Sequence, residues 1–343
     1  MSAAAGIRTR RSEPDRRGLA GWLAASAGAQ AATVLRADEL PGGAVQQHWA
    51  LDVVFDGGGM AGRQALVLRA NFQTPLPASR SKAAEFATLQ RVHAAGLTVP
   101  APLFLCDDDS VIGTPFFVMR RLPGSAERAP LLAAAARDGF GDALGAELAG
   151  ELARLHALSP DEPSSGPAAQ SLFDGYRAWL ADLSDVGQSG IAAPARALDW
   201  LAAQAPDRPA TALVHRDFRT GNFLVVGGRL TGILDWEFAG PGDPAEDIGW
   251  LCARCWRGGV DAREAGGLTT RATFLAAYEA AGGAPIPAAV IDYWEVMAHL
   301  RWALIARQQA RRAAAGDTPQ HELVEAAGRI AGLDADLLRL VGA

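Results

Sequence analysis

Between residues 34 and 119 the apolar side chains fall into short runs with the alternation of strands. The runs cover residues 34–36, 48–55, 64–69 and 115–119, and polar or glycine-rich stretches separate them. The stretch from Asp56 to Gly59 carries three glycines between the second and third runs, which suits a hairpin turn. This region therefore predicts an antiparallel sheet.

Two helices are predicted beside this sheet. Asp15 suits the N-cap of an amphipathic helix that carries Leu19, Trp22 and Leu23 on one face. A second helix is expected at residues 81–95, because related positions recur there at steps of three and four residues.

Beyond Gly124 the apolar positions change to a helical period, interrupted by one strand, turn and strand between residues 212 and 235. Gly227 and Gly228 mark the bend of that hairpin. We expect helices at residues 140–158, 172–183, 193–203, 269–281, 286–314 and 321–332. The fold class is thus predicted as α+β: a disordered tail (1–17), an N-terminal lobe built on an antiparallel sheet (18–121) and a larger, mainly helical C-terminal lobe (122–343).

Composition narrows the class of function. The 343 residues carry a formal net charge of -6, which argues against a nucleic-acid partner because such partners need a basic face. No run of about 18 apolar residues occurs, so no membrane partner is expected. Three cysteines form no disulfide framework, which favours a reducing, cytoplasmic location. Cys252 and Cys255 are interpreted as small apolar helix residues, since no second ligand pair lies near them.

The segments His215 to Asn222 and Ile233 to Glu237 carry the strongest chemical signal. They place Asp217, Asn222 and Asp235 in the order used for metal-assisted phosphoryl transfer. In that pattern Asp217 orients or deprotonates the acceptor hydroxyl, and Asn222 and Asp235 hold Mg²⁺ through hard oxygen ligands. Arg219 is expected to point at the transferring phosphate. Because Asp235 ends a short apolar strand, both carboxylates are predicted at one end of adjacent strands.

These motifs resemble the aminoglycoside phosphotransferase-like branch of the protein-kinase-like superfamily, and more narrowly the phosphotransferase domain fused to some acyl-CoA dehydrogenases. The likeness runs from about residue 19 to residue 333. It implies a two-lobed kinase-like fold, ATP or GTP as donor, Mg²⁺, and a small-molecule hydroxyl as acceptor. By position, the resemblance also assigns Asp247 as the carboxylate that braces the active-site loops from the start of a helix.

The N-terminal lobe departs from the usual kinase pattern. Kinases place a lysine on the third strand, paired with a helix glutamate. Here Arg69 occupies that position, and Glu85 is the expected partner. Gly42 and Gly43 are candidates for the loop that covers the phosphates, although the loop lacks the G-x-G-x-x-G pattern.

Three apolar residues are candidates for the adenine site. Val67 is expected above the base, Leu224 below it, and Met119 beside the linker; all three would serve equally well as ordinary core. Two histidines receive structural interpretations. His156 is expected to be a packed or hydrogen-bonded core residue, and His215 a buttress of the catalytic loop.

The sequence therefore predicts a nucleotide- and Mg²⁺-dependent small-molecule kinase. The alternative, prompted by Arg69 and the unusual glycine loop, is a nucleotide-binding module with weak or no catalysis. The acceptor stays open between an aminoglycoside, a hydroxyacyl-CoA, a sugar and an amino alcohol, because one fold can host many substrates. The oligomeric state is not predicted.

Overall fold

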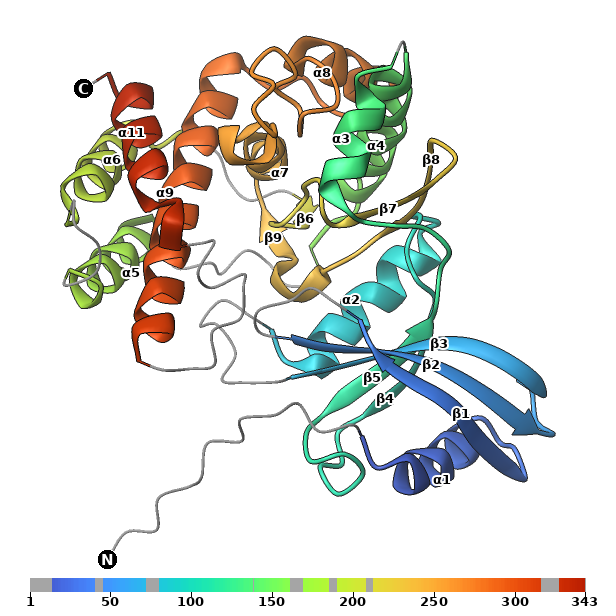
Figure 1. Ribbon diagram of the computed structural model, residues 1–343. Helices are drawn as coiled ribbons and strands as arrows, with labels where there is room; N and C mark the ends of the chain where they lie inside the picture. Colours follow the sequence, from blue (N-terminus) through green and yellow to red (C-terminus); the bar gives the residue numbers. More distant parts are fainter. Residues whose placement is uncertain are drawn as a thin grey trace, which may run out of the picture. The chain divides into compact units, whose positions relative to one another are not determined.

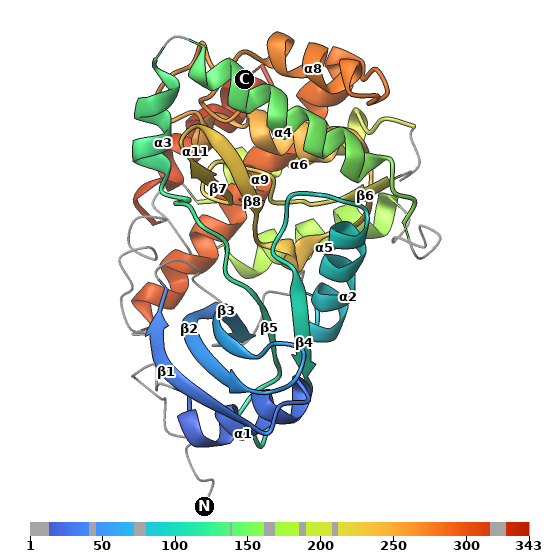
Figure 2. The ribbon, with the colours of Figure 1, turned by 90° about the vertical axis from the view of Figure 1, so that its right-hand side faces the viewer.

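The structure is a computed structural model that describes residues 14–40, 46–71, 80–137, 139–160, 169–184, 190–207, 212–315 and 327–342. The chain forms two compact units (Figures 1 and 2). Residues 1–93 and 100–122 make the first unit, and residues 94–99 and 123–343 make the second.

The first unit contains the predicted antiparallel sheet. Its strands are β1 (Ala31–Glu39), β2 (Gln46–Asp56), β3 (Gly62–Asn71), β4 (Pro102–Cys106) and β5 (Phe116–Arg120), in the order β1-β2-β3-β5-β4. Residues 57–61 connect β2 to β3, so the predicted hairpin turn is confirmed. Gly58 has a φ of 74°, and a Cβ there would lie 2.7 Å from the Ala27 carbonyl oxygen, which explains the glycine at this position.

The two helices of the first unit cover opposite faces of the sheet. In α1 (Arg16–Ser26), Trp22 packs on Phe116, with ring centroids 4.8 Å apart. In α2 (Lys82–Ala94), Phe86 packs on the next strand residue, Phe117, at 5.7 Å. Successive strand residues point to opposite faces, so the helices lie on either side of β5 (Figure 1). The predicted N-cap of α1 is confirmed, because the Asp15 carboxylate accepts the first backbone N–H groups.

The second unit is mainly helical. Its helices are α3 (Arg128–Ala135), α4 (Phe140–His156), α5 (Ala169–Asp182), α6 (Ala192–Ala203), α7 (Pro244–Cys252), α8 (Arg271–Ala280), α9 (Ala288–Ala314) and α11 (Ile330–Leu340). The sequence prediction missed α3. The end predicted for the last helix, residue 332, is wrong, because α11 continues to Leu340; the start of that prediction lies outside the described residues.

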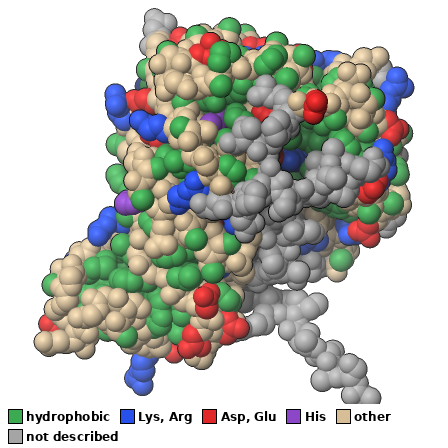
Figure 3. Space-filling view, turned by 180° about the vertical axis from the view of Figure 1, so that it is seen from behind, with side chains coloured by type: hydrophobic (Ala, Val, Ile, Leu, Met, Phe, Trp, Pro, Cys, Tyr) green, Lys and Arg blue, Asp and Glu red, His purple; other side chains and the backbone are tan. Residues whose placement is uncertain are grey.

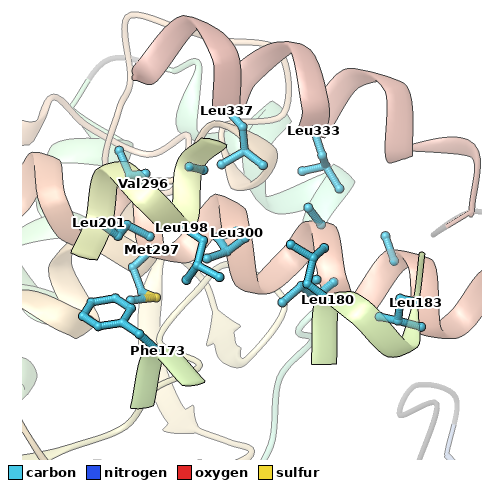
Figure 4. Packing of buried hydrophobic residues seen from close by; sticks show 14 of the residues in the cluster. Phe173, Leu180, Leu183, Leu198, Leu201, Val296, Met297, Leu300, Leu333 and Leu337 are labelled. Carbon is cyan, nitrogen blue, oxygen red and sulfur yellow. The ribbon is translucent and has the colours of Figure 1, made fainter. Parts of the chain in front are cut away.

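The core of the second unit explains why α11 runs through Gly332. Its apolar side chains come from α5, α6, α9 and α11 (Figure 4), and Leu333 and Leu337 of α11 belong to the same buried cluster as Leu300 of α9. A buried ion pair adds to this packing. Arg307 on α9 is fully buried and donates to both carboxylate oxygens of Asp334 on α11, at 2.9 and 2.8 Å.

Four short strands position the motifs in the second unit. They are β6 (Ala212–Val214), β7 (Phe223–Val226), β8 (Arg229–Ile233) and β9 (Gly240–Gly242). Strand β6 pairs with β9, and β7 pairs with β8 across the predicted bend at Gly227 and Gly228. The prediction that Asp217 and Asp235 end adjacent strands is therefore wrong: Asp217 follows β6, whereas Asp235 follows β8.

Residues 94–99 belong to the second unit because a hydrogen-bond network holds them there. The Ile233 N–H donates to the Thr98 carbonyl oxygen at 2.8 Å. The Glu151 carboxylate accepts from the Thr98 N–H and hydroxyl at 2.9 and 2.6 Å.

None of the helices among the described residues is long and apolar enough to span a bilayer. On the face shown in Figure 3, outside the grey atoms, basic and acidic side chains occur in small separate groups without a continuous basic area, which agrees with the negative net charge.

Candidate functional site

One buried carboxylate, that of Asp247, binds the backbone of the loop that follows β6. Asp247 lies in the first turn of α7 and is fully buried. Its Oδ2 accepts the His215 N–H at 2.8 Å, and its Oδ1 accepts the Arg216 N–H at 2.7 Å. The structure thus brings Asp247 to the loop that the resemblance assigned it to brace.

The charge of Asp247 is maintained despite its burial. Burial opposes the ionisation of Asp247, but the hydrogen bonds that its carboxylate accepts from His156 and from the His215 N–H hold its pKa below the ordinary value. His156 Nε2 lies 3.1 Å from Asp247 Oδ2, and its Nδ1 lies 2.9 Å from the Tyr278 hydroxyl. His156 is therefore a hydrogen-bonded core residue, as predicted.

The side chain of His215 ties the catalytic loop to the β7–β8 hairpin. Its Nδ1 accepts the Asp217 N–H at 3.1 Å, and its Nε2 donates to the Leu234 carbonyl oxygen at 2.8 Å. Accepting at Nδ1 and donating at Nε2 requires the neutral Nε2–H tautomer. The predicted buttress role of His215 is confirmed by these bonds.

The carboxylate of Asp217 is oriented by three donors. Its Oδ1 accepts from Arg219 Nε and from Trp250 Nε1, both at 2.9 Å. Its Oδ2 accepts from Asn222 Nδ2 at 2.6 Å. A carboxylate offers about four lone-pair sites. Two bonds occupy Oδ1 and one occupies Oδ2, so Oδ2 keeps acceptor capacity for a further hydroxyl.

Asn222 and Asp235 lie at the open end of the β7–β8 hairpin. The Leu234 N–H donates to the Asn222 carbonyl oxygen at 2.9 Å, which places Asn222 beside the residue that precedes Asp235. Asp235 has a left-handed φ of 65°. Its carboxylate also raises the pKa of Arg219, so the charges of Asp217, Arg219 and Asp235 lie within electrostatic reach of one another.

The donor set fits Mg²⁺. Asn222 Nδ2 donates to both the Asp217 carbonyl oxygen and its carboxylate, so the amide presents its Oδ1 as an acceptor. Together with the Asp235 carboxylate this makes a hard, oxygen-only pair of ligands, and Mg²⁺ is usually held by one or two carboxylates plus substrate phosphates. Among the described residues, no group of three or more His, Cys, Asp and Glu side chains could hold a metal.

Arg219 does not extend freely from the loop. Its guanidinium lies over the Trp256 ring, 4.5 Å from the centroid, while its Nε bonds Asp217. Burial disfavours its charge, but the Asp217 and Asp235 carboxylates raise its pKa. The Arg219 guanidinium is therefore a cation that Trp256 and Asp217 fix in place next to the Asp217 carboxylate.

In the first unit the structure brings Arg69 and Glu85 together. Arg69 Nε lies 2.6 Å from Glu85 Oε1, and both side chains are almost completely buried. Val67 and Met119 face one another across the β3–β5 pairing, whereas Leu224 lies on β7 in the second unit. Gly42 and Gly43 lie outside the described residues.

Sequence reasoning missed Trp250 and the surroundings of Arg216. Trp250 looks like any apolar helix residue in the sequence, yet its indole N–H donates to Asp217. Glu246 is paired with Arg216 Nε at 3.4 Å and with Arg301 Nη1 at 2.5 Å. Arg301 also donates to the Tyr176 hydroxyl at 2.7 Å. These partners come from distant helices, and no spacing pattern marks them.

The cysteine pair carries no reactive signal. Cys252 is buried and Cys255 is partly buried, and both are free thiols. Burial raises the pKa of each thiol to about 12, so neither is a thiolate at neutral pH. The prediction of small apolar residues agrees with this environment.

Comparison with known proteins supports the resemblance seen in the motifs. Residues 48–300 match the model of the phosphotransferase enzyme family. A curated relative, acyl-CoA dehydrogenase family member 10 of Mus musculus, is 29% identical over 198 residues, which cover 56% of this chain. The aligned region is 18% of that relative's length, so most of the relative has no counterpart here.

Solved structures share the fold. A candidate aminoglycoside phosphotransferase from Ralstonia eutropha superposes with a TM-score of 0.72 at 20% identity, covering 96% of this chain and 98% of its own. A thermostable mutant of the aminoglycoside phosphotransferase APH(4)-Ia, in complex with ADP and hygromycin B, gives a TM-score of 0.59 at 18% identity, covering 94% and 98%. The fold is therefore the predicted protein-kinase-like one.

Proposed function

This chain belongs to the phosphotransferase enzyme family, and from that premise we propose that it transfers the γ-phosphate of ATP or GTP to a hydroxyl group of a small molecule, with Mg²⁺. The observation that carries the proposal is the oriented carboxylate of Asp217, with Asn222 and Asp235 gathered at the neighbouring hairpin end. Phosphoryl transfer depends mainly on positioning and on neutralising charge, and these residues supply both.

Asp217 acts on the acceptor in this proposal. Arg219 and Trp250 occupy Oδ1, so Oδ2 receives the acceptor hydroxyl. It takes up the hydroxyl proton as the oxygen bonds to the γ-phosphorus and the bond from that phosphorus to the bridging oxygen breaks, which releases ADP or GDP. General-base assistance of this kind contributes about 10² to 10⁴ in rate. Arg219 stays close enough to share its positive charge between Asp217 and the phosphoryl group that is transferred.

Asn222 and Asp235 would hold the metal ion through Asn222 Oδ1 and the Asp235 carboxylate. When bound, Mg²⁺ neutralises negative charge on the phosphate oxygens. Arg69, paired with Glu85, would contribute a fixed cation for the phosphates of the nucleotide. Arginine keeps its charge and offers a planar fork to phosphate, so this departure from lysine is compatible with nucleotide binding.

The acceptor is proposed only as a class, a small molecule with an alcohol group. The structure of APH(4)-Ia cited above contains hygromycin B and ADP, which supports a nucleotide donor and a small-molecule acceptor for this chain. Screening aminoglycosides, sugars, amino alcohols and hydroxyacyl-CoAs for ATP and GTP consumption would identify the acceptor.

The decisive test replaces the carboxylate of Asp217. Asp217→Asn keeps the size of the side chain and Asp217→Ala removes it; both should abolish phosphate transfer while Mg-ATP affinity, measured by calorimetry, changes little. A matched control is Asp243→Asn, at the N-cap of α7, which should retain transfer. Transfer at the wild-type rate by Asp217→Asn would remove the assignment. Nucleotide binding by a wild-type chain without turnover would favour the non-catalytic module instead.

A further inference from the structure

We propose that the acceptor alcohol carries an anionic oxygen group, a carboxylate or a phosphate, which Arg301 and Tyr176 bind beside the catalytic loop. The inference rests on the proposed function and narrows the class of acceptor. Arg301 lies on α9 and Tyr176 on α5, both in the second unit (Figure 1). The phosphoryl-transfer motifs include neither residue, and the steps proposed above give neither a part.

The guanidinium of Arg301 is fixed on one edge and open on another. Its Nε donates to the Tyr176 hydroxyl at 2.7 Å, and its Nη1 donates to Glu246 Oε1 at 2.5 Å. Its Cζ lies 5.9 Å from the centroid of the Trp294 ring. Its Nη2 has no acceptor among the described residues, and 19% of the side chain is exposed. An arginine carries five N–H donors, so the Nη2 edge is available to a ligand.

The hydroxyl of Tyr176 adds a second donor. Its oxygen accepts from Arg301 Nε, because arginine has no acceptor atom, and its own hydrogen therefore points to another group. The part of the chain that the structure describes contains no acceptor for this hydrogen. Arg301 and Tyr176 thus present N–H and O–H donors side by side. A carboxylate or a phosphate matches them, because it offers acceptors alone and forms strong hydrogen bonds with charged donors.

Glu246 does not neutralise the positive charge around Arg301 completely. Its buried carboxylate lies 2.5 Å from Arg301 Nη1 and 3.4 Å from Arg216 Nε, so one carboxylate faces two guanidinium groups. Two further carboxylates of α7 and its N-cap bind backbone N–H groups: Asp247 those of the catalytic loop, and Asp243 that of the helix. An anionic ligand would therefore find a guanidinium with an open edge at this place.

These residues lie near the carboxylate that receives the acceptor hydroxyl. Arg216 directly precedes Asp217, and Glu246 lies one turn before Trp250 on α7, whose indole N–H donates to Asp217. Residues one turn apart share a helix face and are separated by about 6 Å along the axis. A hydroxyl at Asp217 and an anionic group at Arg301 are then separated by a distance that a small molecule can span.

The same arrangement disfavours an acceptor with several amino groups. An ammonium group placed at the open edge of Arg301 would meet a second cation and a donor hydroxyl, and neither can accept a hydrogen bond from it. Juxtaposed like charges suppress the binding of a wrong partner. Arg301 would therefore select anionic over cationic alcohols as well as bind them.

A binding test compares alcohols that differ in one group. Straight-chain hydroxycarboxylates and hydroxyalkyl phosphates of increasing length are each matched with the hydroxyamide and the amino alcohol of the same length, and calorimetry measures their affinities in the presence of Mg-ADP. An anionic member should bind about 10- to 100-fold more tightly than its amide, the effect of a charge-assisted hydrogen bond. The proposal is overturned if no anionic member binds more tightly than its matched amide and amino alcohol.

Substitutions test which side chains bind the anion. Arg301→Met should abolish the preference for the anion over the amide, and Tyr176→Phe should reduce it by about two- to tenfold. In Arg301→Met the Glu246 carboxylate keeps Arg216 as its partner. The control is Arg311→Met, which removes an equal charge from the same helix at a position where 40% of the side chain is exposed. It should keep the wild-type preference.

A purely structural role of Arg301 gives a different result. Arg301→Met would then lower the melting temperature and leave the ratio of anion to amide affinity unchanged, which would refute the anion site. The proposed transfer fails separately. A chain that phosphorylates an amino alcohol as fast as the matched hydroxycarboxylate and hydroxyalkyl phosphate refutes the anionic acceptor alone. A chain that binds the anions through Arg301, but transfers phosphate to none of them, keeps the anion site and refutes the transfer.

Discussion

Trp250 offers the sharpest test of how the second unit positions Asp217. Its indole N–H donates to Asp217 Oδ1 at 2.9 Å, and its side chain is buried. Trp250→Phe removes this donor and keeps an aromatic ring. The Asp217 carboxylate then retains Arg219 on Oδ1 and Asn222 on Oδ2, so its charge stays paired, but one of the three bonds that set its direction is lost.

The expected loss of rate in Trp250→Phe follows from the kind of hydrogen bond that is removed. A hydrogen bond to a charged group contributes about 1.5–3 kcal/mol, and about 1.4 kcal/mol corresponds to a tenfold change in rate. Because two donors remain on Asp217, we expect the lower end of that range, a fall of about tenfold in kcat. The KM for the nucleotide should change little, since Asp217 acts on the acceptor.

Trp302→Phe is the matched control. Trp302 packs on Trp256 with ring centroids 5.2 Å apart, and no hydrogen-bond partner of its buried indole nitrogen is found among the described residues. Both substitutions delete the same atoms, so the loss of packing is comparable. Steady-state phosphate transfer, followed by ADP release with the acceptor found in the panel, compares the two. Equal kcat values for Trp250→Phe and Trp302→Phe would refute the positioning role of Trp250.

Two further predictions concern stability. Asp334→Asn leaves the fully buried Arg307 guanidinium without its carboxylate, so urea denaturation should show a fall of about 3–5 kcal/mol in the free energy of unfolding. The control is Asp336→Asn, whose partner Arg254 is 42% exposed and which should lower that free energy by under about 1 kcal/mol. Equal losses in the two variants would contradict this reasoning. The lowered pKa of Asp247 means that its contribution is present above its ordinary value of 3.8 and disappears as pH falls below it. The stability difference between the wild type and Asp247→Asn should therefore shrink below about pH 3.8, and a constant difference from pH 7 to pH 3 would exclude an ionised Asp247 as its cause.

Local signals were sufficient for most of the fold. The alternating runs and the glycine turn predicted the sheet of the first unit, because a strand and its hairpin are specified by neighbouring residues. The helix α3 was missed since it is short and its N-cap position, Glu127, makes no side-chain cap bond. Gly332 was interpreted as a helix end, but packing of Leu333 and Leu337 against α9 outweighs the cost of about 1 kcal/mol for an interior glycine.

The sequence predicted the candidate site only where its residues lie close together in the chain. Asn222 and Asp235 flank one hairpin, so their proximity follows from local pairing. The pairing of β6 with β9 is not local, and it places Asp217 on a different ladder from the one expected. Trp250 was missed for a similar reason: its partner, Asp217, is more than 30 positions away in the sequence.

Backbone strain shows why these long-range contacts matter to the site. Among the described residues, Arg216 and Asp235 are the two non-glycine residues with positive φ, both at 65°, a conformation that costs about 1–3 kcal/mol. Such strain persists only where the surroundings determine the conformation. Asp247 holds the Arg216 N–H, and His215 holds the Leu234 carbonyl that precedes Asp235. Arg216 precedes Asp217, and Asp235 is itself the proposed metal ligand, so the buried contacts of Asp247 and His215 help to set the directions of the proposed catalytic groups.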